Sequence, residues 1–494
     1  MGYFLSSAVD AIAPSAFCFL PLPMPRSIRI HPDHKQAVAM ALERNGFLTQ
    51  GDLAAHLEIA LSTVSNFFRG VNVSVAKFEE ITGALGLEPR ELIQAKAVTA
   101  LDSSESPVSQ PLTFFAYDDA WVGRQRLVSA LSARVRGDCR LLLLTGIAGV
   151  GKTALAERLT LELSGFSAVQ RENFDAQDRA TDFGSFAARL LAALGQVVTP
   201  DNRSDAQQLL NRLVQILKTS RCLILIDSLE ELLQGDERQG WSEFKDGVFG
   251  QFFQRVLAAE SFQSRLVVTS QELPTQLLGF GSRYQNVWFK QPLTGLSDSE
   301  QRLLFEKTGL DMRPDTESRS LLTRIGHAYE GHPLALRVIT GEIGSRPFFG
   351  DVVAYWNRYG HEIKAVEQAI AEAAAGQAVG ADDKWRLDRF TSTLRHNVRL
   401  RLEQTFERLR RDARLAYILL CEVSVYRCAV PEDWWLSHLD YWECEAEAAE
   451  MALDALRDRF LVEEAIESGQ YTLRQHSLIR SVSLDHLKRL DAKL

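Results

Sequence analysis

Several features that would define other classes of protein are missing from this chain of 494 residues. Its six cysteines are scattered, with no CxxC pair and no Cys/His spacing of the kind that holds zinc. We therefore expect reduced thiols, a cytoplasmic protein and no structural zinc. No apolar run reaches the roughly 18 residues that a membrane-spanning helix needs, so we expect no membrane partner.

Two further absences narrow the function. The net charge of −9 argues against a generally basic protein that coats nucleic acid, although it leaves room for a local binding site. No period of about 30 to 45 residues repeats along the chain, so a solenoid of sensor repeats is not expected within it. We therefore expect either that a protein sensor or effector lies on another chain or that the sensor arm has been lost.

Residues 1–24 form an apolar segment without the basic start of a secretory signal. Asp10 and three prolines interrupt it, and Met24 offers an alternative start of translation. We interpret this segment either as a disordered leader or as an extension that is not part of the protein.

Residues 25–97 predict a small helical domain. An amphipathic pattern covers 35–46, a second helix follows with Leu53 and Leu57 inward, and Ser62 opens a third. This spacing resembles the phage-repressor class of helix-turn-helix domains, in which the third helix enters the major groove of DNA. The resemblance assigns DNA contact to Ser62, Thr63, Ser65, Asn66 and Arg69.

The same domain contains eight Lys/Arg and eight Asp/Glu. A charge-neutral module gains little free energy from releasing counterions on DNA. Two roles therefore stay open for this fold, which are DNA binding and contact with another protein. Residues 98–113, rich in Ser with two prolines, predict a linker.

Residues 141–155 read LLLLTGIAGVGKTAL, a buried strand that ends in a glycine-rich turn and Lys-Thr. This is the GxxxxGK[ST] phosphate-binding loop, in which backbone N–H groups converge on a polyphosphate at the start of a helix. We expect Lys152 to reach the terminal phosphates and Thr153 to bind Mg²⁺. The predicted cofactors are ATP or ADP with Mg²⁺, and the loop residues are Gly146, Gly149, Val150, Gly151, Lys152, Thr153 and Ala154.

Later strands predict the rest of an α/β nucleotide-binding core over 114–292. The strand RCLILID ends in Asp227, which is placed to hold Mg²⁺. Many ATPases put an acid directly after this one to activate water, but here the next residue is Ser228 and the nearest acid is Glu230. We therefore expect slow ATP turnover, with Lys152, Asp227 and Glu230 as candidate catalytic residues. Thr269, at the end of another strand, is predicted to face the γ-phosphate.

The motifs occur in an order that resembles the signal-transduction ATPases with numerous domains (STAND), in particular their NB-ARC branch. The chain has Val-Gly-Arg at 122–124, the two Walker motifs, Thr-Ser-Gln at 269–271, GHPLAL at 331–336 and RQHSL at 474–478. The resemblance implies a helical lid over 293–348, a connector over 349–386 and a winged-helix domain over 387–494.

It also implies roles for single residues. Val122 and Arg124 would border the adenine, Pro333 would pack on the base, and His476 would reach the β-phosphate of ADP. Gln271 stands where the family has a sensor arginine, and Ser477 stands where it has an aspartate.

We therefore predict a multidomain switch that is closed with ADP and self-associates with ATP. Its output would be transcriptional control, or stress or defence signalling, through the helix-turn-helix. Two alternatives are a DNA-associated helper ATPase of transposition or replication and a nucleotide-responsive repressor.

Overall fold

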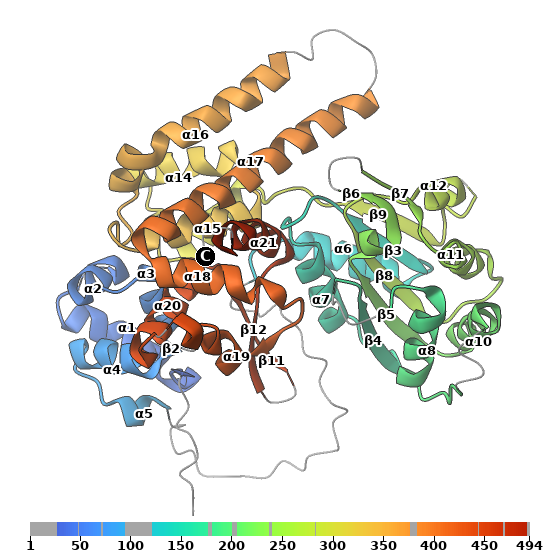
Figure 1. Cartoon of the computed structure of the whole chain (residues 1–494), viewed down its shortest axis with the longest axis horizontal. Helices are drawn as coiled ribbons and strands as arrows, with labels where there is room; N and C mark the ends of the chain where they lie inside the picture. The colour runs from blue at the N-terminus through green and yellow to red at the C-terminus, as the bar shows by residue number, and fades with distance from the viewer. Residues whose placement is uncertain are drawn as a thin grey trace, which may run out of the picture.

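A computed structural model of the chain describes residues 27–491 with gaps at 48, 71–72, 94–120, 176–179, 200–204, 237–239, 282, 376–382, 443 and 468–469. The predicted leader and linker lie outside the described residues. The described chain forms two lobes, an α/β lobe from the middle of the sequence and a helical lobe built from its two ends (Figure 1). No helix among the described residues has the length and apolar character to cross a membrane.

A parallel sheet of five strands forms the centre of the α/β lobe. Its order is β4-β5-β8-β3-β9, so the strand before the phosphate loop (β3) and the strand that ends in Asp227 (β5) both flank β8. All four pairings are parallel, which brings the carboxyl ends of the strands to one edge. The strands are β3 (Leu141–Thr145), β4 (Ala168–Asn173), β5 (Cys222–Asp227), β8 (Arg265–Ser270) and β9 (Trp288–Pro292).

Helices cover both faces of this sheet, which explains the unbroken leucine run of β3. Leu142 and Leu144 pack against one face, whereas Leu141 and Leu143 pack against the other. The first face carries α6 (Gln125–Arg136) and α7 (Lys152–Glu162). The second carries α8 (Phe183–Ala193), α10 (Ala206–Thr219) and α11 (Val248–Ala258). Smaller elements are η2 (Leu229–Leu232), β6 (Leu233–Asp236), β7 (Gly240–Phe244) and α12 (Thr275–Gly281).

The part of the helical lobe that follows β9 in the sequence starts with the segment predicted as a lid. It contains α13 (Asp298–Lys307), α14 (Glu317–Ala328) and α15 (Pro333–Gly344). The predicted connector holds a long helix, α16 (Val352–Ala375). The boundary predicted at 387 falls inside α17 (Asp383–Asp412). That helix is one unbroken element that packs on α16 and α15.

The C-terminal unit combines α17 with smaller elements. A three-stranded antiparallel sheet of order β10-β12-β11 lies beside the helices. The elements are α18 (Arg414–Glu422), η3 (Val423–Val425), β10 (Val430–Pro431), α19 (Glu432–Ser437), η4 (Asp440–Trp442), α20 (Ala446–Asp458), β11 (Glu463–Glu467), β12 (Gln470–Arg474) and α21 (Ser477–Asp491).

The N-terminal unit is a bundle of short helices. Its second helix has a capping box from Thr49 and Asp52, and its third has a left-handed C-cap at Gly70. The elements are β1 (Ser27–Ile28), η1 (Pro32–His34), α1 (Lys35–Arg44), α2 (Gln50–Leu57), α3 (Leu61–Arg69), β2 (Val73–Ser74), α4 (Val75–Ala84) and α5 (Pro89–Ile93).

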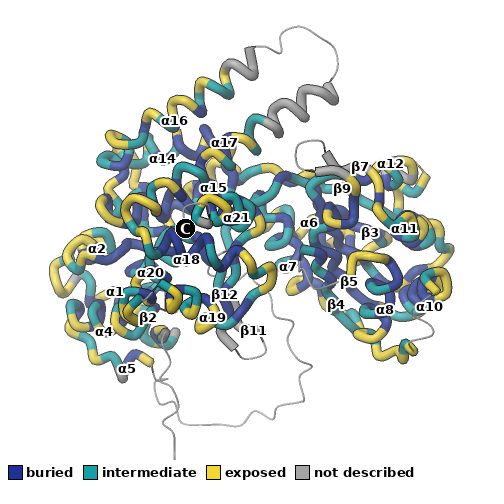
Figure 2. Tube along the Cα trace, in the orientation of Figure 1, coloured by how far each residue is buried: buried dark blue, intermediate teal, exposed yellow. Residues whose placement is uncertain are grey.

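This unit does not stand apart from the rest of the helical lobe. Its apolar side chains join those of the lid and of the C-terminal unit in one continuous core. Buried residues accordingly run through the lobe around α15 and α18 (Figure 2). The sequence predicted a separate module behind a linker, whereas the structure packs it against segments several hundred residues away.

Candidate nucleotide-binding site

The phosphate loop joins β3 to α7 at the carboxyl edge of the sheet. Gly149 and Gly151 have φ angles of 77° and 92°, a region that residues with a Cβ rarely adopt. Lys152 is 8% exposed, and its Nζ donates to the carbonyl oxygens of Gly146 at 2.9 Å and Ile147 at 3.1 Å. The loop therefore has the backbone geometry that the motif predicts, and the Lys152 ammonium is hydrogen-bonded to loop carbonyls.

The two predicted metal ligands lie together. The Thr153 hydroxyl donates to Oδ1 of Asp227 at 2.9 Å. Oxygen ligands from a hydroxyl and a carboxylate at a phosphate site suit Mg²⁺, which takes its remaining ligands from phosphate and water. In this arrangement Thr153 and Asp227 would hold the ion and the ion would neutralise developing phosphate charge.

Thr269 contacts Asp227 in this structure. It is buried, its hydroxyl donates to Oδ1 of Asp227 at 2.6 Å, and the N–H of Ser228 donates to it at 3.0 Å. Because β8 lies beside β5, the last residues of β8 lie close to Asp227, the predicted metal ligand. In this structure Thr269 positions Asp227, and contact with a γ-phosphate stays a prediction.

Arg171 on β4 is a site residue that the sequence did not reveal. Its Nη2 donates to Oδ2 of Asp227 at 2.7 Å, and its Nη1 forms an ion pair with Glu157 of α7. Burial raises the pKa of Asp227, but the charge of Arg171 and the hydrogen bonds from Thr269, Arg171 and Thr153 together hold the pKa below its usual range. Nothing in the local sequence marks this arginine, because the contact depends on strand order.

Glu230 lies at the same edge, in the short helix after Asp227. It is 6% exposed, and its Oε2 accepts the N–H of Gln271 at 3.2 Å. Burial raises the pKa of this carboxyl, and the charge of Lys152 opposes that rise. A carboxyl with a raised pKa near the phosphate-loop lysine is a candidate proton acceptor for an attacking water.

Arg124 ties the core to the lid. It has a φ angle of 61°, and its Nη2 donates to the carbonyl oxygens of Val150 and Thr294, both at 2.9 Å. Burial lowers its pKa to about 10, which leaves it charged at neutral pH. Val122 is partly buried against the core of the helical lobe. Arg124 therefore braces the phosphate loop from outside, and the predicted contact of both residues with adenine stays a prediction.

A second contact between the lid and the loop comes from His332, which the sequence analysis did not single out. The ring is fully buried, and its Nδ1 accepts the N–H of Ala335 at 3.3 Å as the N-cap of α15. The proton must then sit on Nε2, which lies 2.9 Å from the Ala148 carbonyl and donates to it. Burial lowers the pKa of His332 to about 3, so the ring is neutral.

Replacing His332 with leucine tests this contact. We expect His332→Leu to lower the local opening free energy of the first turn of α15 by about 1–3 kcal/mol, because the Ala148 carbonyl and the Ala335 N–H both lose a partner. Native-state hydrogen exchange of that turn measures the effect. His327→Leu on α14, whose side chain is 57% exposed, serves as the control and should change little. Equal exchange in both variants would contradict a bracing role for His332.

Pro333 and His476 complete the predicted set. Pro333 is the first residue of α15, directly after His332. His476 precedes α21, and its Nδ1 accepts the N–H of Leu478 at 3.1 Å, which places the proton of the neutral ring on Nε2. Burial lowers the pKa of His476, and Lys152 is among the nearby charges that lower it further. The structure thus brings His332, His476 and Lys152 to one region, between core, lid and C-terminal unit.

The residues predicted to contact DNA are placed differently. Ser62 and Ser65 are buried, and Thr63 is partly buried. Ser62 and Thr63 donate to Asp458 of α20, whereas Ser65 donates to the Lys307 carbonyl. Arg69 donates to Asn66 within α3. In this conformation the first three side chains are engaged within the chain, because α3 packs on the lid and the C-terminal unit.

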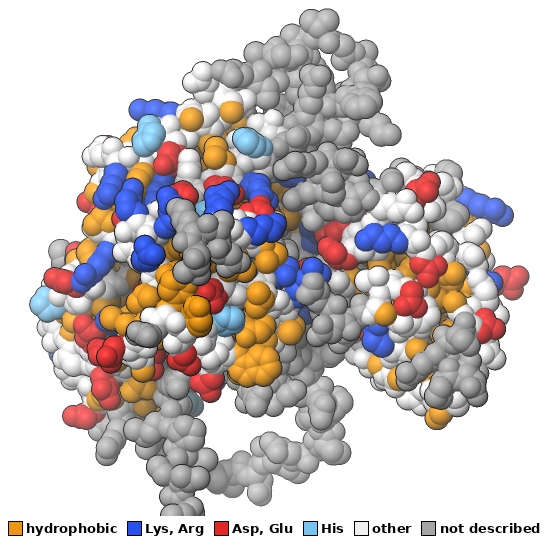
Figure 3. All heavy atoms as spheres, in the orientation of Figure 1, with side chains coloured by type: hydrophobic (Ala, Val, Ile, Leu, Met, Phe, Trp, Pro, Cys, Tyr) orange, Lys and Arg blue, Asp and Glu red, His pale blue; other side chains and the backbone are white. Residues whose placement is uncertain are grey.

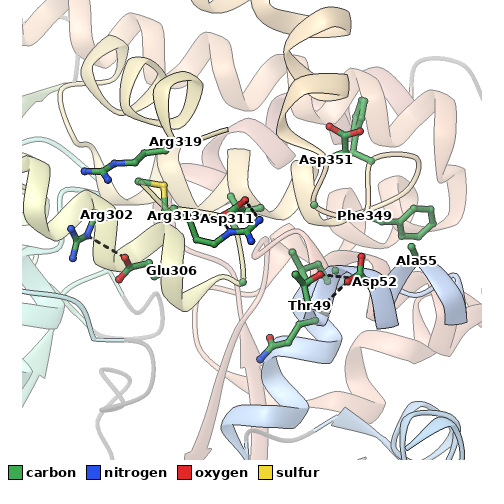
Figure 4. A pocket seen from close by; sticks show the side chains of 18 of the residues that line it. Thr49, Asp52, Ala55, Arg302, Glu306, Asp311, Arg313, Arg319, Phe349 and Asp351 are labelled. Carbon is green, nitrogen blue, oxygen red and sulfur yellow. Dashed lines mark hydrogen bonds and ion pairs between the residues drawn. The ribbon is translucent and has the colours of Figure 1, made fainter. Parts of the chain in front are cut away.

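A separate cleft of about 960 Å³ lies between α2, the segment after α13 and residues 348–351 (Figure 4). Its charged side chains largely satisfy one another, since Arg313 pairs with Asp311 and Arg302 with Glu306. None of the predicted nucleotide-binding residues lines it. We therefore place the nucleotide at the phosphate loop and not in this cleft.

Comparison with known proteins supports the assignment of a nucleotide-binding core. Residues 120–242 match the AAA ATPase domain family. A Nostoc protein described as an uncharacterized WD repeat-containing protein, alr2800, is 32% identical over 222 residues, which cover 44% of this chain and 17% of that protein. The chain thus spans less than a fifth of this relative.

Two solved archaeal structures resemble the chain at low identity. A STAND protein with a tetratricopeptide repeat sensor from Pyrococcus horikoshii is 15% identical, with 76% of this chain and 44% of that chain covered at a TM-score of 0.46. A Walker-type ATPase from Pyrococcus abyssi is 13% identical, with 75% and 97% covered at a TM-score of 0.33.

The loop geometry, the Thr153–Asp227 contact and the match over 120–242 converge on one conclusion. This chain carries an α/β P-loop ATPase core.

Proposed function

We propose that this protein is an ATP/ADP-controlled switch of the STAND type. The N-terminal unit is its helix-turn-helix output domain, the lid and the winged-helix C-terminal domain close over the nucleotide, and exchange of ADP for ATP opens them and permits self-association. Output is transcriptional control, or stress or defence signalling, and Mg²⁺ accompanies the bound ATP.

One observation carries the proposal. Two histidines from outside the core converge on the phosphate loop, His332 through its bond to Ala148 and His476 through its proximity to Lys152. Each has its proton on Nε2 and is therefore a neutral donor at neutral pH. An ADP phosphate bound by His476 and Lys152, on a loop that His332 already ties to the lid, would hold core, lid and C-terminal unit together, which is what a nucleotide-controlled closure requires.

The mass of the protein in solution tests the switch. We expect a monomer with ADP and a larger assembly with a slowly hydrolysed ATP analogue, measured by light scattering with and without duplex DNA. ATP turnover without partners should fall below the roughly 1–100 s⁻¹ of kinases, because Ser228 follows Asp227 where a carboxylate base would stand. Unchanged mass together with rapid, DNA-stimulated turnover would instead favour a helper ATPase.

His476→Ala tests the closure directly. We expect faster ADP dissociation and more self-association, because one hydrogen bond to phosphate is lost, worth about 1–3 kcal/mol. This corresponds to about a 5- to 150-fold change in the closed-to-open ratio. His438→Ala, in the same unit but bonded to Glu422 and Tyr426, is the matched control. If both variants release ADP like the wild type, His476 is a packing residue only.

A further inference from the structure

The surface of α3 that faces the rest of the helical lobe is built as a docking surface. Leu61 at its start inserts among glycines near the lid, since a Cβ added to Gly309, Gly344 or Gly350 would come within 3.5 Å of the Leu61 side chain. Ser65, one turn later, donates to the Lys307 carbonyl at the end of α13. These contacts fix the register of α3 against its neighbours.

A single carboxylate completes this surface. Oδ1 of Asp458, the last residue of α20, accepts the Ser62 hydroxyl at 3.0 Å and the Thr63 hydroxyl as well. Burial raises the pKa of Asp458 to about 6, and the two hydroxyls partly offset that rise. Ser and Thr hydroxyls of DNA-binding helices commonly donate to phosphate oxygens. Asp458 therefore engages the two hydroxyls that could donate to a phosphate oxygen.

The charge of α20 adds to this blockade. Asp454, Glu450 and Glu447 precede Asp458 by about one, two and three helical turns, so they lie along one side of α20. Acidic side chains gather at the level of α20 and α1, in the lower left of the helical lobe (Figure 3). A DNA backbone that approached docked α3 would meet carboxylates of its own sign.

We infer that the C-terminal unit covers the first turn of α3, and that undocking of Asp458 from Ser62 and Thr63 frees these two hydroxyls for a phosphate of the DNA backbone. The inference rests on the proposed function, in which nucleotide exchange moves the C-terminal unit away from the core. That movement would uncover the Ser62 and Thr63 hydroxyls of α3. DNA and the C-terminal unit are then competing occupants of one surface.

The junction between the N-terminal unit and the rest of the helical lobe combines a continuous apolar core with one open side. One side of the junction opens into the 960 Å³ cleft, which Leu61, Gly309 and Gly350 help to line. Thr49 and Asp52 of α2 face Asp351 and the Asp311–Arg313 pair across that cleft (Figure 4). Beyond the cleft, Arg346 and Glu58 form an exposed ion pair. Such pairs contribute little to stability.

Asp458→Ala in the full chain tests the inference. We expect hydrogen exchange in α3 to speed up about tenfold, the equivalent of about one charge-assisted hydrogen bond. Affinity for a mixed-sequence DNA duplex at low salt should rise by a similar factor. For Asp458→Asn, which keeps an acceptor, both the exchange rate and the DNA affinity should lie between those of the wild type and Asp458→Ala. Asp485→Asn, which removes a carboxylate bonded to Arg399 on α17, is the matched control and should change neither.

A second variant approaches the same contact from α3. Ser62→Ala combined with Thr63→Val should speed up exchange as Asp458→Ala does, but should not raise DNA affinity, because the hydroxyls that would donate to phosphate are gone. ADP binding, measured for every variant, shows that the core is intact.

The outcomes separate this inference from the proposed function. Unchanged α3 exchange in Asp458→Ala overturns the inference, even if ADP and the ATP analogue still change the mass. Faster exchange without a gain in DNA binding overturns the assignment of DNA as the competing occupant. Faster exchange with tighter DNA binding supports the inference, and does so even if nucleotide has no effect on mass, in which case only the proposed switch fails.

Discussion

Lys152→Ala is expected to lower the affinity for both ATP and ADP by more than about 100-fold. Lys152 is 8% exposed in the loop, and a charge-assisted bond to phosphate contributes about 1.5–3 kcal/mol. Since 1.4 kcal/mol is a factor of ten, the loss of one or two such bonds spans that range. Isothermal titration with each nucleotide measures it.

The matched control is Lys290→Ala, on the neighbouring strand β9, whose side chain is exposed. Its nucleotide affinity should equal that of the wild type. Because Lys152 also donates to two loop carbonyls, hydrogen exchange of β3 and α7 should accompany the titration. Lys152→Ala protein with intact exchange and unchanged ADP affinity would contradict the assigned site.

Glu342→Gln is expected to lower the opening free energy of α15 and α17 by about 3–5 kcal/mol, the usual cost of breaking a buried ion network. Glu342 accepts from Arg408 at 2.6 Å, Thr405 at 2.6 Å and Tyr355 at 3.1 Å, and it also pairs with Arg401. Arg401 is fully buried. With Gln at 342, the two arginines keep Glu362 as their shared carboxylate.

The effect should depend on pH in a defined direction. Burial raises the pKa of Glu342, but Arg401 and Arg408 outweigh it and lower the pKa from 4.5 to about 2. A lowered pKa stabilises the folded state above about pH 4.5, and this stabilisation is lost as the pH falls towards 2. The gap between wild type and Glu342→Gln should therefore narrow from pH 5 downwards.

Glu367→Gln provides the comparison, because Glu367 pairs with Arg324 at the surface, where both side chains are at least 30% exposed. Exposed pairs contribute about 0–1 kcal/mol. Native-state hydrogen exchange reports both variants locally, which suits a chain of several units that need not unfold together. Equal losses in the two variants would mean that the buried network does not stabilise the lobe.

The sequence predicted those parts of the site that are local in the chain. The phosphate loop needs only a strand, a glycine turn and a helix in succession, and Asp227 needs only the end of a strand. It did not predict Arg171, because that contact depends on β4 lying beside β5. It missed His332 for a related reason, since the ring serves both as a cap of its own helix and as a donor to a distant loop.

The helices of the N-terminal unit were also predictable, because capping residues and apolar spacing are local signals. The docking of α3 against the lid and the C-terminal unit could not be predicted from the sequence. A row of hydroxyls on a short helix is compatible with a phosphate, with a carboxylate or with water, and the sequence around Asp458 does not mark it as the partner.

The contact between Ser62 and Asp458 joins residues that are 396 positions apart. Synthesis on the ribosome proceeds at about 5–20 residues per second and N-terminal segments emerge first, so α3 is made some 20 to 80 seconds before the helix that covers it. During that interval the hydroxyl surface is open. A growing or truncated chain would thus display the surface that the finished chain covers, and this difference is fixed by the order of synthesis alone.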